Sequence, residues 1–192
     1  MHNLTKEDIS MAKIALLFTT GTEECEALNV VDILRRAGEE LSIVSVSGDR
    51  TVTGSHDITI IADEIIEEHD FTEDDVLIIP GGAPGTNNLE ANEYVQKAID
   101  MLNAQGKLIC AICAAPKILG HKGLLQGRKA GIYPGLEAEL EGANVSFDEV
   151  SIDGNFVTSR GLGTAIPFAL AILSILEGKD VSDTMAERIV FL

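Results

Sequence analysis

The chain has 192 residues, of which 45% are hydrophobic, and a formal net charge of −17 at pH 7. This length suits one domain with a substantial core. The negative charge repels nucleic-acid backbones and anionic membranes, so we expect neither as a partner. The longest strongly apolar stretch, residues 165–176, is too short to span a bilayer.

Three cysteines, Cys25, Cys110 and Cys113, are too few for a disulfide scaffold. The first ten residues are polar and the apolar run after them is short, which does not fit a secretory signal peptide. We therefore expect a reducing, cytoplasmic location. Residues 1–11 are predicted to be a disordered extension, and residues 12–192 are predicted to form a single domain.

Strand and helix patterns alternate along the chain, and Gly38 and Gly178 are predicted to end helices. The predicted strands are residues 13–18, 41–46, 76–79, 108–112, 130–133, 146–150 and 156–158, with a hairpin of 51–52 and 58–61. The predicted helices are residues 23–37, 90–104 and 163–176, with a further helical stretch directly after Cys113. This alternation predicts an α/β fold with a mostly parallel sheet and helices on both faces.

Ligand sites in parallel sheets form where the carboxyl ends of strands meet. Three segments directly follow predicted strands, namely residues 19–26, 80–84 and 113–115. We therefore expect the chemistry of this protein in these segments.

Cys113 stands at the turn between an apolar strand and the helical stretch that follows it. A helix N-terminus favours anions and lowers the pKa of a cysteine, which predicts a nucleophile or a redox sensor. The alternative is an inert cysteine of the core. Cys110 and Cys113 form a C-x-x-C pair, but three residues of strand separate their Cα atoms by roughly 10 Å. A disulfide needs less than about 7 Å, so we expect Cys110 in the core rather than in a redox pair.

Glu26 shares a helical face with the apolar residues Val30, Ile33 and Ala37, so its carboxyl group is predicted to point inward. An isolated buried carboxylate is costly and tends to be protonated or hydrogen-bonded. Glu26 is therefore either an ordinary acidic residue of a first helical turn or a proton donor to the Cys113 thiolate. Cys25 is a rival thiol, but its glutamate neighbours are expected to raise its pKa.

The turn Pro80-Gly81-Gly82 follows a buried strand, and glycine lets backbone amides approach a ligand closely. The amides of Gly82 and Ala114 are predicted to form an oxyanion hole, with a plain tight turn as the alternative. The segment 159–164 is predicted to be a loop before the last long helix. The four histidines lack metal-ligand spacing with the cysteines, and most of them are expected at the surface, with His69 on a solvated face.

Taken together, these motifs resemble the ThiJ/PfpI superfamily, in the branch of the Parkinsonism-associated deglycase, and bacterial members most of all. The matching segments occur in the family order, and they are residues 21–26, 31–38, 79–82, 111–116 and 158–164. The resemblance implies a flavodoxin-like α/β sandwich, a homodimer, a nucleophilic Cys113, a buried Glu26, and Gly81, Gly82 and Ala114 around the thiol. It also implies cofactor-free glyoxalase or deglycase activity on small aldehydes or glycated groups, or a redox-sensing chaperone function in oxidative stress.

Many members of the family carry a histidine where this chain has Tyr133. A tyrosine has a pKa of about 10 and is a poor base at neutral pH, so Tyr133 is expected to contact substrate without relaying protons. The absence of a Cys–His pair argues against a protease mechanism and leaves the proton transfers to Glu26. Two hypotheses follow: a cysteine-dependent glyoxalase or deglycase without cofactor or metal, and a stress sensor that uses oxidation of the same cysteine.

Overall fold

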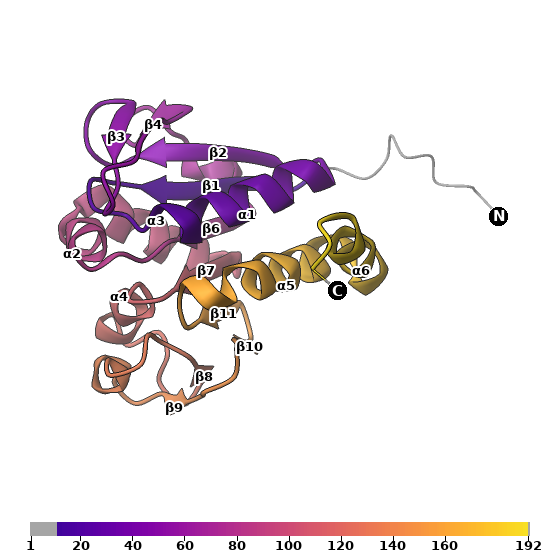
Figure 1. Ribbon diagram of the computed structural model, residues 1–192. Helices are drawn as coiled ribbons and strands as arrows, with labels where there is room; N and C mark the ends of the chain where they lie inside the picture. The colour runs from indigo at the N-terminus through magenta and orange to yellow at the C-terminus, as the bar shows by residue number, and fades with distance from the viewer. Residues whose placement is uncertain (1–10, 192) are drawn as a thin grey trace.

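The computed structural model describes residues 11–191 (Figure 1). Apart from Met11, the predicted extension at residues 1–11 lies outside the described residues. Across the described part of the chain, no helix has both the length and the apolar character needed to cross a membrane.

A seven-stranded sheet forms the middle layer, in the order β10-β11-β7-β6-β1-β2-β5. All pairings in this sheet are parallel except the one between β10 and β11. Its strands are β1 (Lys13–Phe18), β2 (Glu40–Ser45), β5 (Glu64–Ile65), β6 (Val76–Ile79), β7 (Leu108–Ile112), β10 (Val150–Asp153) and β11 (Phe156–Ser159). Two small pairs lie outside it: β3 (Thr51–Thr53) with β4 (Thr59–Ile61), and β8 (Lys129–Ala130) with β9 (Asn144–Val145).

Helices cover both faces of the sheet, so successive residues of a strand enter different cores. In β1, Ile14, Leu16 and Phe18 join one apolar cluster, whereas Ala15 and Leu17 join the other. The first cluster packs against α1 and α5, and the second packs against α3 and α4 (Figure 1). The α-helices are α1 (Glu24–Ala37), α2 (Ala83–Ala91), α3 (Glu93–Ala104), α4 (Pro116–His121), α5 (Ala165–Glu177) and α6 (Lys179–Arg188). Short 3-10 turns cover Phe71–Glu73, Glu137–Glu139 and Leu162–Thr164.

Local residues fix both ends of α1. The Glu23 carboxylate accepts a hydrogen bond from the Glu26 amide at 2.6 Å, which satisfies a free N–H of the first turn. Gly38 adopts the left-handed conformation with φ of 101°, and glycine does this without a steric cost. The predicted helix at 23–37 is thereby confirmed to within one residue.

Three predicted elements differ in the structure. The predicted helix at 90–104 is divided at Asn92, whose side chain accepts the amides of Tyr94 and Val95 and starts α3. The predicted strand at 130–133 keeps only Ala130, because the Tyr133 amide turns to the Cys113 carbonyl instead of a sheet partner. The predicted strand at 146–150 is wrong except for its last residue, because the Ser146 hydroxyl accepts the Asp148 amide in a turn. Helices α2 and α6 were not predicted.

Candidate active site

Four loops meet at the carboxyl edge of the sheet, because β11, β7, β6 and β1 are neighbours in it. They are residues 19–23, 80–82, 113–115 and 160–164, and each directly follows one of these strands. The expectation that the first three segments share one edge is confirmed. The fourth loop also belongs to the site, which the sequence analysis did not foresee.

Cys113 forms a strained elbow between β7 and α4. Its φ is 62°, in the left-handed region that non-glycine residues rarely adopt. Its amide donates to the Ser159 carbonyl at 3.1 Å, and its carbonyl accepts the Tyr133 amide at 2.8 Å. Because both backbone groups are held, the half-buried thiol has a fixed direction at the end of the strand.

Glu26 points inward from the first turn of α1, as predicted, and is only 2% exposed. Its Oε2 accepts the Gly81 amide at 3.2 Å, and its carboxylate also accepts the Leu162 amide and the Cys113 thiol. Burial raises the pKa of Glu26 to about 7, and the charge of Glu23 adds to this rise. Glu26 is therefore able to take up or release a proton near neutral pH.

The resting thiol of Cys113 is protonated, in contrast to the expectation of a lowered pKa. Burial, followed by the charge and the hydrogen bond of Glu26, raises the pKa of Cys113 to about 12. The amides of Gly82 and Ala114 face the sulfur and lower this pKa, but they do not outweigh burial. In the resting state the Cys113 thiol therefore donates a hydrogen bond to Glu26. When Glu26 is ionised, its carboxylate is able to accept the thiol proton.

Glycine is required at positions 81 and 82 because other atoms of the site pack closely against their Cα atoms. A Cβ on Gly81 would lie 2.4 Å from both the Cβ of Cys113 and Oε2 of Glu26. A Cβ on Gly82, where φ is 97°, would lie 2.4 Å from the Gly21 carbonyl oxygen. No side chain fits at either position, which explains the two consecutive glycines after β6.

An apolar cavity of about 430 Å³ opens directly beside the thiol. Tyr133 lines it and is half exposed, while its ring lies next to Gly161. The full lining is Ala83, Cys113, Ala114, Tyr133, Pro134, Gly135 and Leu136. Of the predicted site residues, Cys113, Ala114 and Tyr133 reach this cavity, whereas Glu26, Gly81 and Gly82 lie around the sulfur.

The two other cysteines lie apart from this chemistry. Cys110 is fully buried among the apolar residues of the core, as predicted, and burial raises the pKa of its thiol. Cys25 is exposed, and its pKa is raised by desolvation and then by the charges of Glu23, Glu24 and Glu26. Neither of these thiols lines the cavity beside Cys113.

The amide of Leu162 is the functional group that sequence reasoning missed. It donates to Glu26 from the loop after β11. The Thr164 hydroxyl oxygen holds this loop by accepting the amides of Arg160 and Gly161, each at 3.2 Å. The segment 158–164 is one of the motifs that match the family, and this match was the sequence signal that pointed to the loop.

Two clusters of ionisable groups lie away from the thiol cavity. Within residues 11–191, one group of at least three possible metal-ligating side chains has its ligand atoms within 4.8 Å of one another. It consists of Glu23, Glu24 and His56. In this group the Glu24 carboxylate accepts the His56 amide at 2.7 Å, and this bond helps to hold the pKa of Glu24 at about 2 against the effect of burial.

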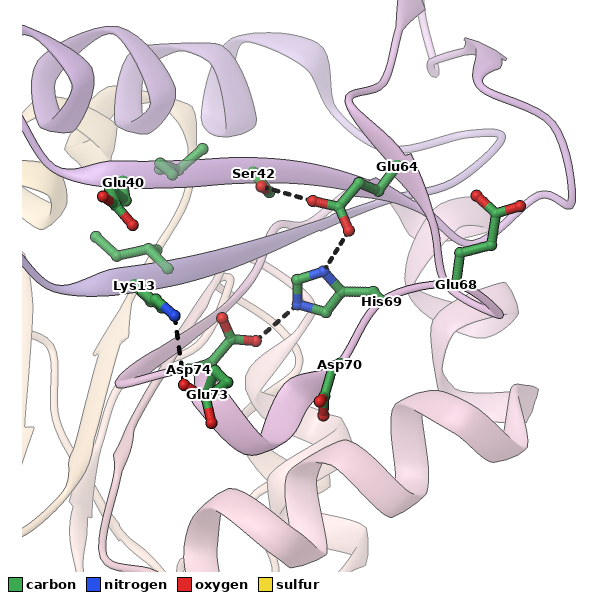
Figure 2. A pocket seen from close by; sticks show the side chains of 11 residues that line it. Lys13, Glu40, Ser42, Glu64, Glu68, His69, Asp70, Glu73 and Asp74 are labelled. Carbon is green, nitrogen blue, oxygen red and sulfur yellow. Dashed lines mark hydrogen bonds and ion pairs between the residues drawn. The ribbon is translucent and has the colours of Figure 1, made fainter.

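The second cluster lines a separate cavity of about 430 Å³ near β1, β2 and β5 (Figure 2). Here the imidazole of His69 lies between Glu64, at 2.9 Å, and Asp74, at 2.8 Å (Figure 2). The His69 side chain is 9% exposed, so its prediction as a solvated residue is wrong. The two carboxylates provide hydrogen-bond partners for both ring nitrogens, which permits this burial. The lining of this cavity contains no cysteine, in contrast to the lining of the cavity beside Cys113.

The model of the DJ-1/PfpI family matches residues 12–175. The chain belongs to this family. It is 34% identical to the protein dj-1beta of Drosophila melanogaster, over 92% of this chain and 96% of that protein. It is 30% identical to a protein named as a deglycase from Pyrococcus abyssi, over 86% of this chain and 99% of that protein. The structure of oxidized Toxoplasma gondii DJ-1 superposes with a TM-score of 0.90 at 33% identity, covering 93% of this chain and 98% of that one. These comparisons confirm the predicted family and the α/β fold.

Proposed function

We propose that this protein is a cofactor-independent glyoxalase or deglycase that acts on methylglyoxal, glyoxal or their adducts through Cys113. The observation that carries the proposal is the hydrogen-bonded pair of the Cys113 thiol and the buried Glu26 carboxylate at the mouth of a cavity. A thiol paired with a base of pKa about 7 is a means of activating a nucleophile at neutral pH. The relative named as a deglycase in Pyrococcus abyssi supports this choice of chemistry.

The first step joins the sulfur of Cys113 to the aldehyde carbon of methylglyoxal. Glu26 accepts the thiol proton while the carbonyl oxygen gains the electron pair of the C=O bond. In this proposal the amides of Gly82 and Ala114, which face the sulfur, stabilise the negative charge that develops on the carbonyl oxygen. Glu26 then returns the proton to the oxygen, which gives a hemithioacetal and restores the carboxylate for the second step.

The second step moves a proton between two adjacent carbons. A base removes the C–H proton of the hemithioacetal carbon, and the neighbouring carbonyl oxygen is protonated, which gives an enediol. The second carbon then gains a proton, either the same one or one exchanged with solvent, while the hydroxyl on the first carbon loses its proton and becomes the carbonyl of a thioester. Glu26 is the titrating group in contact with the sulfur and carries this role. The resulting thioester reacts with water and releases lactate and the free thiol. The net reaction is methylglyoxal plus water to lactic acid, without a change in the enzyme.

The decisive experiment measures lactate formation from methylglyoxal by wild type, Cys113→Ser and Cys25→Ser. We expect Cys113→Ser to lose turnover and Cys25→Ser, which changes an exposed thiol outside the cavity, to retain it. Lactate formation by folded Cys113→Ser at the wild-type rate would overturn the mechanism.

A second function, redox sensing through the same thiol, is favoured by the relative whose structure is described as oxidized. Two molecules of peroxide would convert the thiol to a sulfinic acid and release two molecules of water. The amides of Gly82 and Ala114 are positioned as donors to the added oxygens. Peroxide titration followed by peptide mass analysis tests this function. We expect two oxygens at Cys113 before any at Cys25, and the opposite order would contradict it.

A further inference from the structure

The cavity beside Cys113 has an uncharged and mostly apolar wall. Its lining contains no acidic or basic side chain, and its largest side chains are Tyr133, Pro134 and Leu136. The ring of Tyr133 is backed by Gly161, where an added Cβ would lie 3.4 Å from the ring carbon Cδ2. The ring therefore forms a supported wall, and any substituent of a substrate bound at the sulfur meets apolar groups.

The cations on neighbouring segments are engaged elsewhere. The guanidinium of Arg160 donates to the Phe147 carbonyl at 3.1 Å and lies 5.8 Å from the centre of the Phe147 ring. The ammonium of Lys117 donates to Asn87 at 2.6 Å and lies 3.5 Å from a carboxylate oxygen of Glu90. Neither residue is part of the cavity lining, so no positive side chain of the lining offers a counter-charge to an anion.

The ionisable side chain in contact with the sulfur is an acid, so it carries a negative charge when it is ionised. Glu26 contacts the sulfur and titrates near neutral pH, and the whole chain carries a net charge of −17. An anionic group entering the cavity would lose hydration, meet no cation in the wall and lie close to Glu26. An apolar group would instead gain free energy from the burial of its surface against Tyr133 and Leu136.

We propose that this site selects neutral carbonyl compounds with an apolar substituent and rejects those that also carry a carboxylate. The turnover part of this inference rests on the proposed function, whereas the selection itself is a property of the cavity wall. For 2-oxoaldehydes, the expected order of kcat/KM is phenylglyoxal and methylglyoxal first, glyoxal next and the carboxylate-bearing 4,5-dioxovalerate last.

The first test measures selection without turnover. Iodoacetamide and iodoacetate are similar in size and differ in charge, and both alkylate a thiol by forming a C–S bond and releasing iodide. For each thiol, the measured quantity is the rate of alkylation by iodoacetamide divided by the rate with iodoacetate. We expect this ratio to be at least about tenfold larger for Cys113 than for 2-mercaptoethanol under the same conditions. Peptide mass analysis assigns the rate to Cys113, and an equal preference for the two thiols would overturn the inference.

Matched variants separate the wall from the overall charge. Leu136→Arg adds one cation to the lining and is expected to reduce the preference for iodoacetamide several-fold. Val181→Arg adds the same charge on α6, outside the lining, and is expected to leave the preference unchanged. Leu136→Met keeps the wall neutral and controls for a change of shape. An equal effect of the two arginine variants would show that net charge, not the cavity, makes the selection.

The second test measures kcat/KM for phenylglyoxal, methylglyoxal, glyoxal and 4,5-dioxovalerate with the wild type. We expect at least about a tenfold lower value for 4,5-dioxovalerate than for methylglyoxal, and Leu136→Ala is expected to reduce phenylglyoxal turnover more than methylglyoxal turnover. Turnover of 4,5-dioxovalerate equal to that of methylglyoxal would overturn the inference. Absence of turnover for all four compounds would refute the proposed function, and the alkylation ratio would still decide the selectivity of the cavity.

Discussion

The thiol of Cys113 donates a hydrogen bond to the carboxylate of Glu26, although one follows β7 and the other lies in the first turn of α1. This bond links a thiol whose pKa is raised to about 12 with a carboxyl group whose pKa is raised to about 7. The thiolate therefore forms when a substrate attracts the sulfur and Glu26 takes the proton. Each partner therefore affects the titration of the other.

Replacement of Glu26 by glutamine is expected to lower kcat for methylglyoxal by about 10²–10⁴-fold, because the amide cannot accept the thiol proton. In the wild type, kcat/KM should rise with pH as Glu26 ionises around pH 7, since the base form is the active one. The measurement is the rate of lactate formation from pH 5 to 9. A wild-type profile without a limb near pH 7, or unchanged turnover in Glu26→Gln, would contradict this role.

The same substitution is expected to stabilise the protein at alkaline pH. The pKa of Glu26 rises from 4.5 to about 7 on folding, so its ionisation is disfavoured in the folded state. Its contribution is complete below pH 4.5 and is lost as the pH increases through 7, a loss of about 3 kcal/mol by pH 8 or above. Urea unfolding should therefore show that Glu26→Gln gains stability relative to wild type between pH 5 and pH 8. A constant difference between the two proteins across this range would show that the carboxyl group is not buried.

The reactivity of Cys113 should change in the opposite direction to turnover. The charge and the hydrogen bond of Glu26 both raise the pKa of the thiol, so Glu26→Gln is expected to lower that pKa. Alkylation of Cys113 by iodoacetamide at pH 8 should accordingly become faster in the variant, while lactate formation is lost. Ellipticity and unfolding midpoints serve as the control for folding. Slower alkylation in a folded variant would contradict the conclusion that the charge and the hydrogen bond of Glu26 raise the resting pKa of the thiol.

Gly81→Ala is expected to disrupt the site. The added methyl group would lie 2.4 Å from both Cys113 and Glu26, so one of the two must move away. We expect a loss of turnover of at least about tenfold and a destabilisation of about 1–3 kcal/mol from overpacking. Gly163→Ala is the matched control on the neighbouring loop, because a Cβ there would meet no atom within 4 Å. Equal effects of the two alanines on turnover would contradict this assignment.

His69→Gln tests the buried network of Figure 2. Desolvation lowers the pKa of His69, but hydrogen bonds to Asp74 and Glu64 outweigh it and raise the pKa above 6.5. The stabilisation by the imidazolium is complete below pH 6.5 and is lost as the pH rises through the higher folded-state pKa. We expect the variant to lose about 1–3 kcal/mol at pH 6 and less at pH 9, because it leaves a buried carboxylate short of a partner.

Urea unfolding at the two pH values measures this loss, with His121→Gln as the control. His121 also lies between two carboxylates, but its side chain is 35% exposed, so its loss at pH 6 should be smaller. An equal loss at pH 6 and pH 9 in His69→Gln would show that the imidazole acts without its charge.

The layers of the fold and the edge of the sheet at which the site lies could be predicted from local sequence patterns. Strands such as β6 and β7 are continuous apolar runs, and helices such as α1 carry their caps and their apolar face in local residues. Local periodicity and end signals are properties of neighbouring residues, so they can be read without the fold. The inward direction of Glu26 was predicted for the same reason.

The electrostatic environments of Cys113 and His69 could not be predicted from local sequence patterns, because they depend on contacts between distant segments. Neighbouring residues suggested a lowered pKa for Cys113, but burial and the charge of Glu26, distant in the chain, outweigh the helix amides. His69 stands among acidic residues in the sequence, yet Asp74 and Glu64 enclose it in the folded protein. Desolvation and long-range charge pairs depend on which segments meet, and that meeting is set by the order of strands across the sheet.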